Sequence, residues 1–117
     1  MRKLQVMPSA IEALKHWKQT DNKKYQKIKQ ILEQVCAMPK TGIGKPEPLK
    51  HKLTGLWSRR IDRENRLVYG FDDEYVYLWQ ARYHYSERSE QSSIDEAVEI
   101  DLEDNNLYDT DKDKSKQ

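Results

Sequence analysis

The sequence of 117 residues contains a single cysteine, Cys36, and no apolar run near the roughly 20 residues that span a membrane. One cysteine excludes an intrachain disulfide, and a reducing cytosol is the compartment that fits such a chain. The first 17 residues also lack the apolar stretch of a secretion signal. These absences predict a soluble, cytoplasmic protein with no membrane contact.

Motifs for metal and phosphate binding are missing as well. Three histidines, at positions 16, 51 and 84, lack paired ligand spacing, and one cysteine is too few for a zinc cluster. There is neither a phosphate-binding loop nor the G-x-S-x-G turn of a serine hydrolase. We therefore expect no metal and no cofactor, so any catalysis must use acid–base groups and positive charge.

The net charge of +1 conceals an asymmetry along the chain. Residues 1–85 contain 17 Lys and Arg against 9 Asp and Glu (+8), whereas residues 86–117 contain 4 against 11 (−7). The second segment has 7 apolar residues among 32, too few for a core. The sequence predicts one basic domain over 1–85 and an acidic tail over 86–117 that is disordered or weakly docked. The basic domain suggests a polyanionic partner such as nucleic acid, although lysine-rich helix faces would give the same composition.

Hydrophobic periodicity predicts a strand over residues 4–6 and then two helices. The first helix begins near Pro8, with Ser9 as its expected N-cap. The second begins after Asp21, also an expected N-cap, and ends at Pro39, whose ring does not fit a helix interior.

The second half of the domain has the pattern of strands. Residues 40–55 hold three glycines and two prolines and are expected to form a loop. Three β-rich segments follow, at 56–61, 66–71 and 75–82, separated by polar turns. The predicted fold class is α+β: two N-terminal helices packed on one face of a small antiparallel sheet.

The remaining chemistry suits cleavage of RNA without a metal. The 2′-hydroxyl attacks the neighbouring phosphorus, so a base must take its proton and an acid must protonate the leaving 5′-oxygen. Cations must stabilise the charge on the pentavalent phosphorus. The groups that could serve are Glu47, Lys50, Arg59, Arg60, Arg66 and His84. Each also has an ordinary interpretation, as a loop carboxylate, a structural histidine or a surface cation.

Two further sets of side chains matter for the site. Arg59 and Arg60 are neighbours on one predicted strand, so they point to opposite faces, and alternation alone does not say which face is open. Among the aromatic residues, Trp57, Tyr69 and Trp79 are expected in the core. Tyr85, at the end of the sheet, is the better candidate for stacking on a base.

These motifs resemble the YoeB toxins of the RelE superfamily. The stretch GIGKPEPLKHKLTGLWSRRIDRENRLVYGF at 42–71 and the ending ARYHY at 81–85 carry the resemblance, which extends over residues 1–85. It implies a RelE-like fold related to microbial ribonucleases and cleavage of mRNA in the ribosomal A site. It also implies neutralisation by a YefM-type antitoxin, with operator DNA bound only through that antitoxin; monomer and homodimer both stay open.

The resemblance also implies roles for individual residues. The family's general base falls on Glu47, the arginine that stabilises charge at phosphorus on Arg66, and the acid for the leaving group on His84. Lys50, Arg60 and Tyr85 fall on positions that hold substrate, and Arg60 is chosen over Arg59 on this ground alone. A non-cleaving module that binds ribosome or antitoxin, and a corepressor that acts with antitoxin, are the alternative functions.

This sequence departs from the family pattern at two places. Asn65 stands where the family usually has histidine, and a turn position of this kind is expected to have little effect. The second departure is the acidic tail after Tyr85. We expect it to lie over the basic face of the domain, either as a helix that begins at a capping box, Ser93 to Glu96, or as an edge strand that alternates over 98–102.

Overall fold

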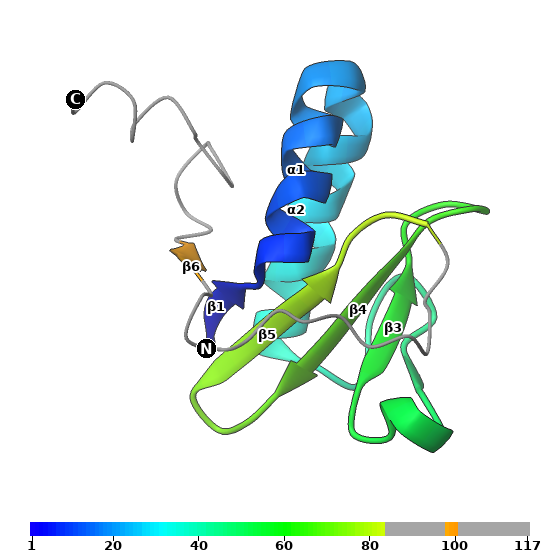
Figure 1. Ribbon diagram of the computed structural model, residues 1–117. Helices are drawn as coiled ribbons and strands as arrows, with labels where there is room; N and C mark the ends of the chain where they lie inside the picture. Colours follow the sequence, from blue (N-terminus) through cyan, green and yellow to red (C-terminus); the bar gives the residue numbers. More distant parts are fainter. Residues whose placement is uncertain (84–97, 101–117) are drawn as a thin grey trace.

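The computed structural model describes residues 1–83 and 98–100, which form two helices and one mixed sheet (Figure 1). The elements follow in the order β1 (Lys3–Val6), α1 (Pro8–Thr20), α2 (Asn22–Ala37), β2 (Glu47–Pro48), the 3-10 turn η1 (His51–Leu53), β3 (Trp57–Arg60), β4 (Arg66–Phe71), β5 (Tyr75–Gln80) and β6 (Val98–Ile100). The predicted α+β architecture is confirmed. No helix within the described ranges is long and apolar enough to cross a bilayer.

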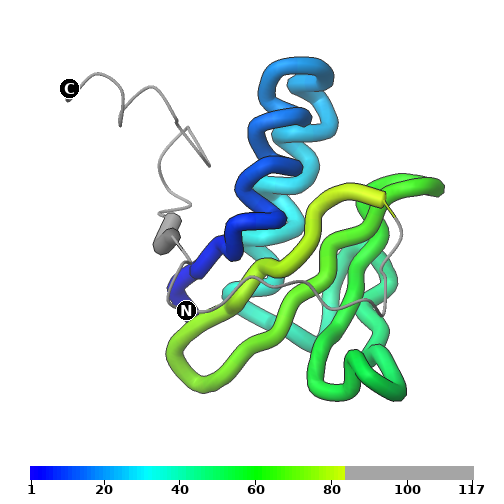
Figure 2. The backbone as a smooth tube through the Cα atoms, viewed as in Figure 1, coloured from blue at the N-terminus to red at the C-terminus, as the bar shows by residue number. Residues whose placement is uncertain are grey.

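The sheet has the strand order β2-β3-β4-β5-β1-β6. Strands β2 to β5 pair antiparallel, which confirms the predicted meander. The first strand β1 instead joins β5 in parallel, with Leu4 opposite Val76 and Val6 opposite Leu78. This parallel pair is possible because the chain returns to the sheet only after the long helical connection. Figure 2 shows that connection as a hairpin of α1 and α2 beside the sheet.

The helix boundaries test two predicted caps. Helix α1 starts with Pro8 in its first turn, but Met7 occupies the N-cap position and makes no side-chain cap. The N-cap prediction for Ser9 is wrong, because its hydroxyl donates to the carbonyl of Trp79 at 2.6 Å and ties α1 to β5 instead. The prediction for Asp21 is confirmed, since its carboxylate accepts from the backbone N–H of Lys24 at 3.1 Å.

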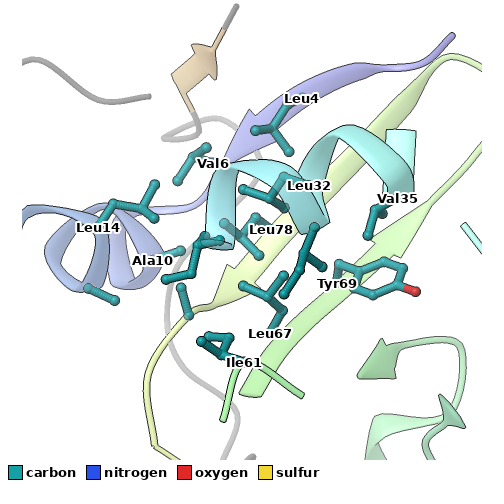
Figure 3. Packing of buried hydrophobic residues seen from close by; sticks show 14 of the residues in the cluster. Leu4, Val6, Ala10, Leu14, Leu32, Val35, Ile61, Leu67, Tyr69 and Leu78 are labelled. Atoms are coloured by element: carbon teal, nitrogen blue, oxygen red, sulfur yellow. The ribbon is translucent and has the colours of Figure 1, made fainter. Parts of the chain in front are cut away.

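The main core lies between the helical hairpin and one face of the sheet (Figure 3). Apolar side chains from both helices meet those of β1, β4 and β5, and the labelled members include Leu14, Leu32, Leu67, Tyr69 and Leu78. All five side chains are fully buried. Each such burial of a leucine contributes about 1.5–3 kcal/mol. The helices therefore cover this face over β1, β4 and β5, and the opposite face is left for other contacts.

A smaller cluster lies apart from the main core and includes residues from the segment predicted as a loop. Leu49 and Leu53 pack against Val68 of β4, with Leu56 and Trp79 at the edge. The prediction of a loop over 40–55 is thus wrong in part, because the segment includes β2 and η1. Leu49 and Leu53 of this segment are buried against the sheet. Trp79, expected in the main core, belongs to this second cluster.

Of the acidic tail, the structure describes only β6. It pairs antiparallel with β1, with Gln5 opposite Glu99. For these three residues the edge-strand alternative is confirmed, and the helix alternative is wrong. Strands β5 and β1 separate β6 from β2, β3 and β4; the rest of the tail, for which docking on the basic face is predicted, lies outside the described residues. The boundary near Tyr85 and the capping box at 93–96 lie outside the described residues.

Candidate functional site

The two neighbouring arginines of β3 point to opposite faces, as alternation predicted. Arg59 is fully buried beneath the helical hairpin, whereas Arg60 is exposed. Arg60 lies directly opposite Arg66 of β4. Residues directly opposite each other in an antiparallel pair share a face, so both of these arginines lie on the face that the helices leave open. The choice of Arg60 over Arg59 agrees with this placement.

The strand register places Glu47 on the same face. Glu47 of β2 lies opposite Ser58, and Ser58 lies opposite Val68. Since Ser58 and Arg60 are two residues apart on β3, their side chains share a face and are spaced by about 7 Å. Glu47, Arg60 and Arg66 therefore form a carboxylate and two cations across three adjacent strands. The sheet brings together three of the six residues predicted for the site.

Of the other three predicted residues, the structure describes only Lys50. Lys50 is exposed at the start of η1, three residues after Glu47. His84 and Tyr85 lie outside the described residues. The first described range ends at Tyr83, whose carbonyl accepts from the backbone N–H of Arg66 at 3.0 Å. The covalent neighbour of His84 is therefore held against the first residue of β4.

Arg59, which the sequence offered as an alternative substrate ligand, instead holds the loop that leads to Glu47. Its Nε donates to the hydroxyl of Tyr69 at 3.1 Å. Its Nη atoms donate to the carbonyls of Met38 at 2.6 Å, Thr41 at 2.7 Å and Ile43 at 3.2 Å. Burial raises the pKa of Tyr69, and the nearby guanidinium of Arg59 opposes that rise. No carboxylate is among these partners; carbonyl dipoles and the phenol solvate the cation.

Gly44 lets the same loop reach the sheet. Its carbonyl accepts from the backbone N–H of Arg60 at 2.7 Å, and its φ is +86°. A Cβ at this position would lie 3.0 Å from the carbonyl oxygen of Arg60, on a backbone that cannot easily give way. Glycine therefore allows the loop to run beside β3 and delivers Glu47 to the edge of the sheet.

A basic hollow of about 640 Å³ lies beside Arg60, between α2 and β3. Its cations are Lys27, Lys45, Arg60 and Arg63, and its one carboxylate belongs to Asp62. Lys27 was not among the site residues that the sequence suggested. Hollows lined mainly by one sign of charge focus the electrostatic field and attract polyanions, and this lining is mainly basic.

The carboxylate of Asp62 is already occupied by partners of its own. It pairs with Lys24 of α2 and accepts from the backbone N–H groups of Glu64 and Asn65. Burial favours the neutral acid, but these donors outweigh it and lower the pKa of Asp62 to about 2. The same ion pair raises the pKa of Lys24. Asp62 thus offsets little of the positive charge that the hollow presents to a ligand.

Asn65 is more than the simple turn residue that the sequence suggested. It is 7% exposed, and its amide bridges Asp62 and the backbone of Tyr83. Ser58, between Glu47 and Val68 in the register, is fully buried, and its hydroxyl has no hydrogen-bond partner among the described residues.

Similarity to solved structures first defines the class of protein. The chain shares its fold with YafQ from Escherichia coli strain BL21(DE3), with a TM-score of 0.57 and 15% identity over 72% of this chain and 94% of that chain. At this identity the likeness shows the fold alone. The fold is that of the RelE/YafQ group: two N-terminal helices on a mostly antiparallel sheet.

More similar proteins show the family. The chain is 45% identical over 85 residues to the toxin YoeB of Mycobacterium bovis, which is 73% of this chain and 100% of that protein. It is 41% identical to the YoeB dimer from Staphylococcus aureus, with a TM-score of 0.67 over 72% of this chain and 98% of that chain. It has the same identity and TM-score with a chain of the heterotetrameric YoeB-YefM toxin-antitoxin complex from Staphylococcus aureus, over 73% of this chain and 99% of that one.

Residues 6–85 also match the family described as YoeB-like toxin of bacterial type II toxin-antitoxin system. The chain therefore belongs to the YoeB family of type II toxins, in the RelE superfamily. The resemblance that the motifs suggested is confirmed.

Proposed function

We propose that this toxin is an endoribonuclease that cleaves mRNA in the ribosomal A site without a metal. The observation that carries the proposal is the common open face of Glu47, Arg60 and Arg66, placed there by the register of β2, β3 and β4. A base and two cations on one face are what attack by a 2′-hydroxyl on phosphorus requires. The family of the chain supports the same reading.

In the proposed reaction, Glu47 takes the proton of the 2′-hydroxyl, and the oxygen attacks the adjacent phosphorus. Arg66, with Arg60 beside it, stabilises the negative charge on the pentavalent phosphorus. His84 gives a proton to the 5′-oxygen as the P–O bond breaks. The products are a 2′,3′-cyclic phosphate and a 5′-hydroxyl. Lys50 and Tyr85 hold the substrate, the tyrosine by stacking on a base.

The ribosome is the proposed partner that aligns the message. The proposed groups lie on the face that the helices leave open, so we expect the protein alone to hold the 2′-hydroxyl poorly in line with the leaving oxygen. Alignment by a larger assembly can supply about 7–11 kcal/mol of the barrier. The basic hollow with Lys27, Lys45 and Arg63 supports the proposal, because it extends positive charge from Arg60 towards α2.

The test is single-turnover cleavage of ribosome-bound and naked message. Glu47→Gln, Arg66→Ala and His84→Ala should each lower the rate on ribosomes by about a hundredfold or more. Glu12→Gln is the matched control for Glu47→Gln, since it neutralises an exposed carboxylate on α1, and it should keep the parent rate. Parent rates for both Glu47→Gln and His84→Ala would refute the mechanism. Equal rates on naked and bound message would refute the dependence on the ribosome.

We also propose that a YefM-type antitoxin neutralises this chain and that the pair binds operator DNA as a corepressor. The support is the solved YoeB-YefM complex from Staphylococcus aureus, at 41% identity to this chain. The YoeB dimer from the same organism likewise supports a homodimer. Light scattering of the purified chain, alone and with a co-expressed YefM-type antitoxin, tests the homodimer and the complex with the antitoxin. A monomer at all concentrations would exclude the homodimer, and failure to co-purify would exclude that antitoxin.

A further inference from the structure

Asn65, at the turn between β3 and β4, makes two kinds of hydrogen bond with its side-chain amide. Its Nδ2 donates to the two carboxylate oxygens of Asp62 at 3.1 and 3.2 Å. Its Oδ1 accepts from the backbone N–H of Tyr83 at 2.6 Å. The chemistry of the partners fixes the orientation of the amide, because an ionised carboxylate only accepts and a backbone N–H only donates.

The carbonyl of Tyr83 is also held by hydrogen bonds, from donors other than Asn65. It accepts from the backbone N–H of Arg66 at 3.0 Å and from the side-chain amide of Gln80 at 3.1 Å. Residues 65 and 66 therefore hold both polar backbone atoms of Tyr83. Its φ of +66° is uncommon for a residue other than glycine. A backbone in such a conformation persists only when its surroundings hold it there.

The residues before Tyr83 are anchored as well. The carbonyl of buried Ala81 accepts from the indole N–H of Trp17 at 2.8 Å. The guanidinium of Arg82 lies over the rings of Trp17 and Tyr83, at 5.8 and 4.5 Å from their centroids. The chain thus leaves β5 along a defined path, and the last described contacts that direct it are those of Tyr83 with Asn65, Arg66 and Gln80.

Asn65 is itself held firmly. Asp62, its partner, forms an ion pair with Lys24 of α2 and closes the turn by accepting from two backbone N–H groups, at 2.8 and 2.7 Å. A line of contacts therefore runs from α2 through Asp62 and Asn65 to the backbone of Tyr83. Two members of this line are next in sequence to residues of the proposed mechanism: Asn65 precedes Arg66, and Tyr83 precedes His84.

We propose that Asn65 is a positioning residue for His84. By accepting the N–H of Tyr83 beside Arg66, it fixes the backbone to which His84 is covalently joined. Consecutive Cα atoms are 3.8 Å apart, so holding Tyr83 confines the origin of the following side chain to a short arc. The inference rests on the proposed function, because it takes His84 as the acid that protonates the leaving oxygen.

The first measurement separates rate from binding. Asn65→Leu removes the acceptor and puts an apolar side chain of similar size in its place. A displacement of about 1 Å at a reacting group can cost about a hundredfold in rate. We expect the single-turnover rate at saturating ribosomes to fall about tenfold to a hundredfold. Ribosome affinity should stay within about twofold, because the buried amide of Asn65 offers little surface to a ligand.

The decisive measurement uses a message in which sulfur replaces the bridging 5′-oxygen at the cleaved bond. When the P–S bond breaks, the electron pair stays on sulfur, and the thiolate leaves without needing a proton. Loss of a positioned acid should therefore matter much less on this substrate. His84→Ala and Asn65→Leu should both recover to within about threefold of the parent on the sulfur message. Glu47→Gln should stay slow on both, because the 2′-hydroxyl still needs a base.

The ratio of the two rates is measured on one protein sample, so a fraction of unfolded Asn65→Leu cancels from it. Asn65→Asp is the second variant. It keeps an acceptor for Tyr83, and its rate ratio should be that of the parent even though it repels Asp62. Lys24→Met is the matched control at the far end of the line. It removes the ion pair with Asp62, so it should lower the melting temperature and leave the ratio unchanged.

Two results would overturn the proposal in distinguishable ways. If Asn65→Leu is equally slow on both messages, or not slow at all, while His84→Ala recovers on sulfur, Asn65 does not position the acid. If His84→Ala fails to recover on sulfur, His84 is not the acid, and the proposed mechanism fails together with the role of Asn65.

Discussion

The fully buried guanidinium of Arg59 should be a main determinant of stability. Its partners are the hydroxyl of Tyr69 and the carbonyls of Met38, Thr41 and Ile43, in the segment that connects α2 to β2. Arg59→Met keeps an unbranched stem of similar reach and removes every donor. The three carbonyls lose a charged donor at once, and among the described residues only a long hydrogen bond, from the backbone N–H of Thr41 to the carbonyl of Met38 at 3.4 Å, remains to them.

The expected cost follows from these contacts. An acceptor left without its partner costs about 1–3 kcal/mol. The lower end applies here, because the loop residues Thr41 and Ile43 are exposed and water can reach their carbonyls. Three acceptors left without this donor then destabilise the folded variant by about 3 kcal/mol. Part of this loss is offset, because the variant no longer buries a cation. We expect the free energy of unfolding to fall by about 2–3 kcal/mol, which corresponds to about 10–20 °C in melting temperature.

Urea unfolding followed by tryptophan fluorescence measures this change. Arg60→Met is the matched control, because it makes the same substitution one residue later on β3, at an exposed position on the other face. Substitutions at exposed positions usually stay within about 0.5 kcal/mol. If Arg59→Met unfolds at the same urea concentration as Arg60→Met, the buried guanidinium is not what holds the loop to the sheet.

Three further expectations can be checked independently. Asp62→Asn should cost about 1 kcal/mol at pH 7. The pKa of Asp62 is lowered to about 2, so its contribution is present above pH 4 and is lost as the pH falls from 4 to 2; a gap between parent and variant that persists at pH 2 would contradict this. Lys27→Glu with Lys45→Glu should weaken ribosome binding at least tenfold at low salt and less at high salt, and equal affinities would show that the hollow does not contact RNA. Deletion of residues 86–117 should tighten ribosome binding, with a gain that shrinks as salt rises; if a variant with the tail sequence reversed binds like the parent, charge alone and no specific docking explains the effect.

The sequence allowed the elements of the domain to be predicted because their signals are local. Apolar residues at helical spacing, Asp21 as a cap and β-rich segments between polar turns all act over a few residues, and the structure has helices and strands there. Where a long-range contact competes, the local prediction was wrong. Ser9, the predicted N-cap, lies inside the first turn of α1 and its hydroxyl donates to the carbonyl of Trp79, 70 residues away. Leu49 and Leu53 of the segment 40–55 pack against Val68, a contact that no local sequence pattern predicts.

The candidate residues divide in the same way. Glu47, Arg60 and Arg66 were recognisable as types of group and by resemblance to a family, but their common face depends on strand register. Asn65 appeared to be an ordinary turn residue. Its contact with Tyr83, 18 residues away, exists only because β4 and β5 pair.

The sequence by itself determined the fold class, the family and the chemical types available for catalysis, since composition, periodicity and motif spacing are properties of the chain. Only the tertiary structure decided which arginine of β3 is buried, which cations line the hollow beside Arg60, and what holds the chain just before His84. The physical reason is that burial and register depend on which distant segments pack together. One arginine then bonds to a loop while its neighbour faces solvent, although the two are adjacent and chemically identical.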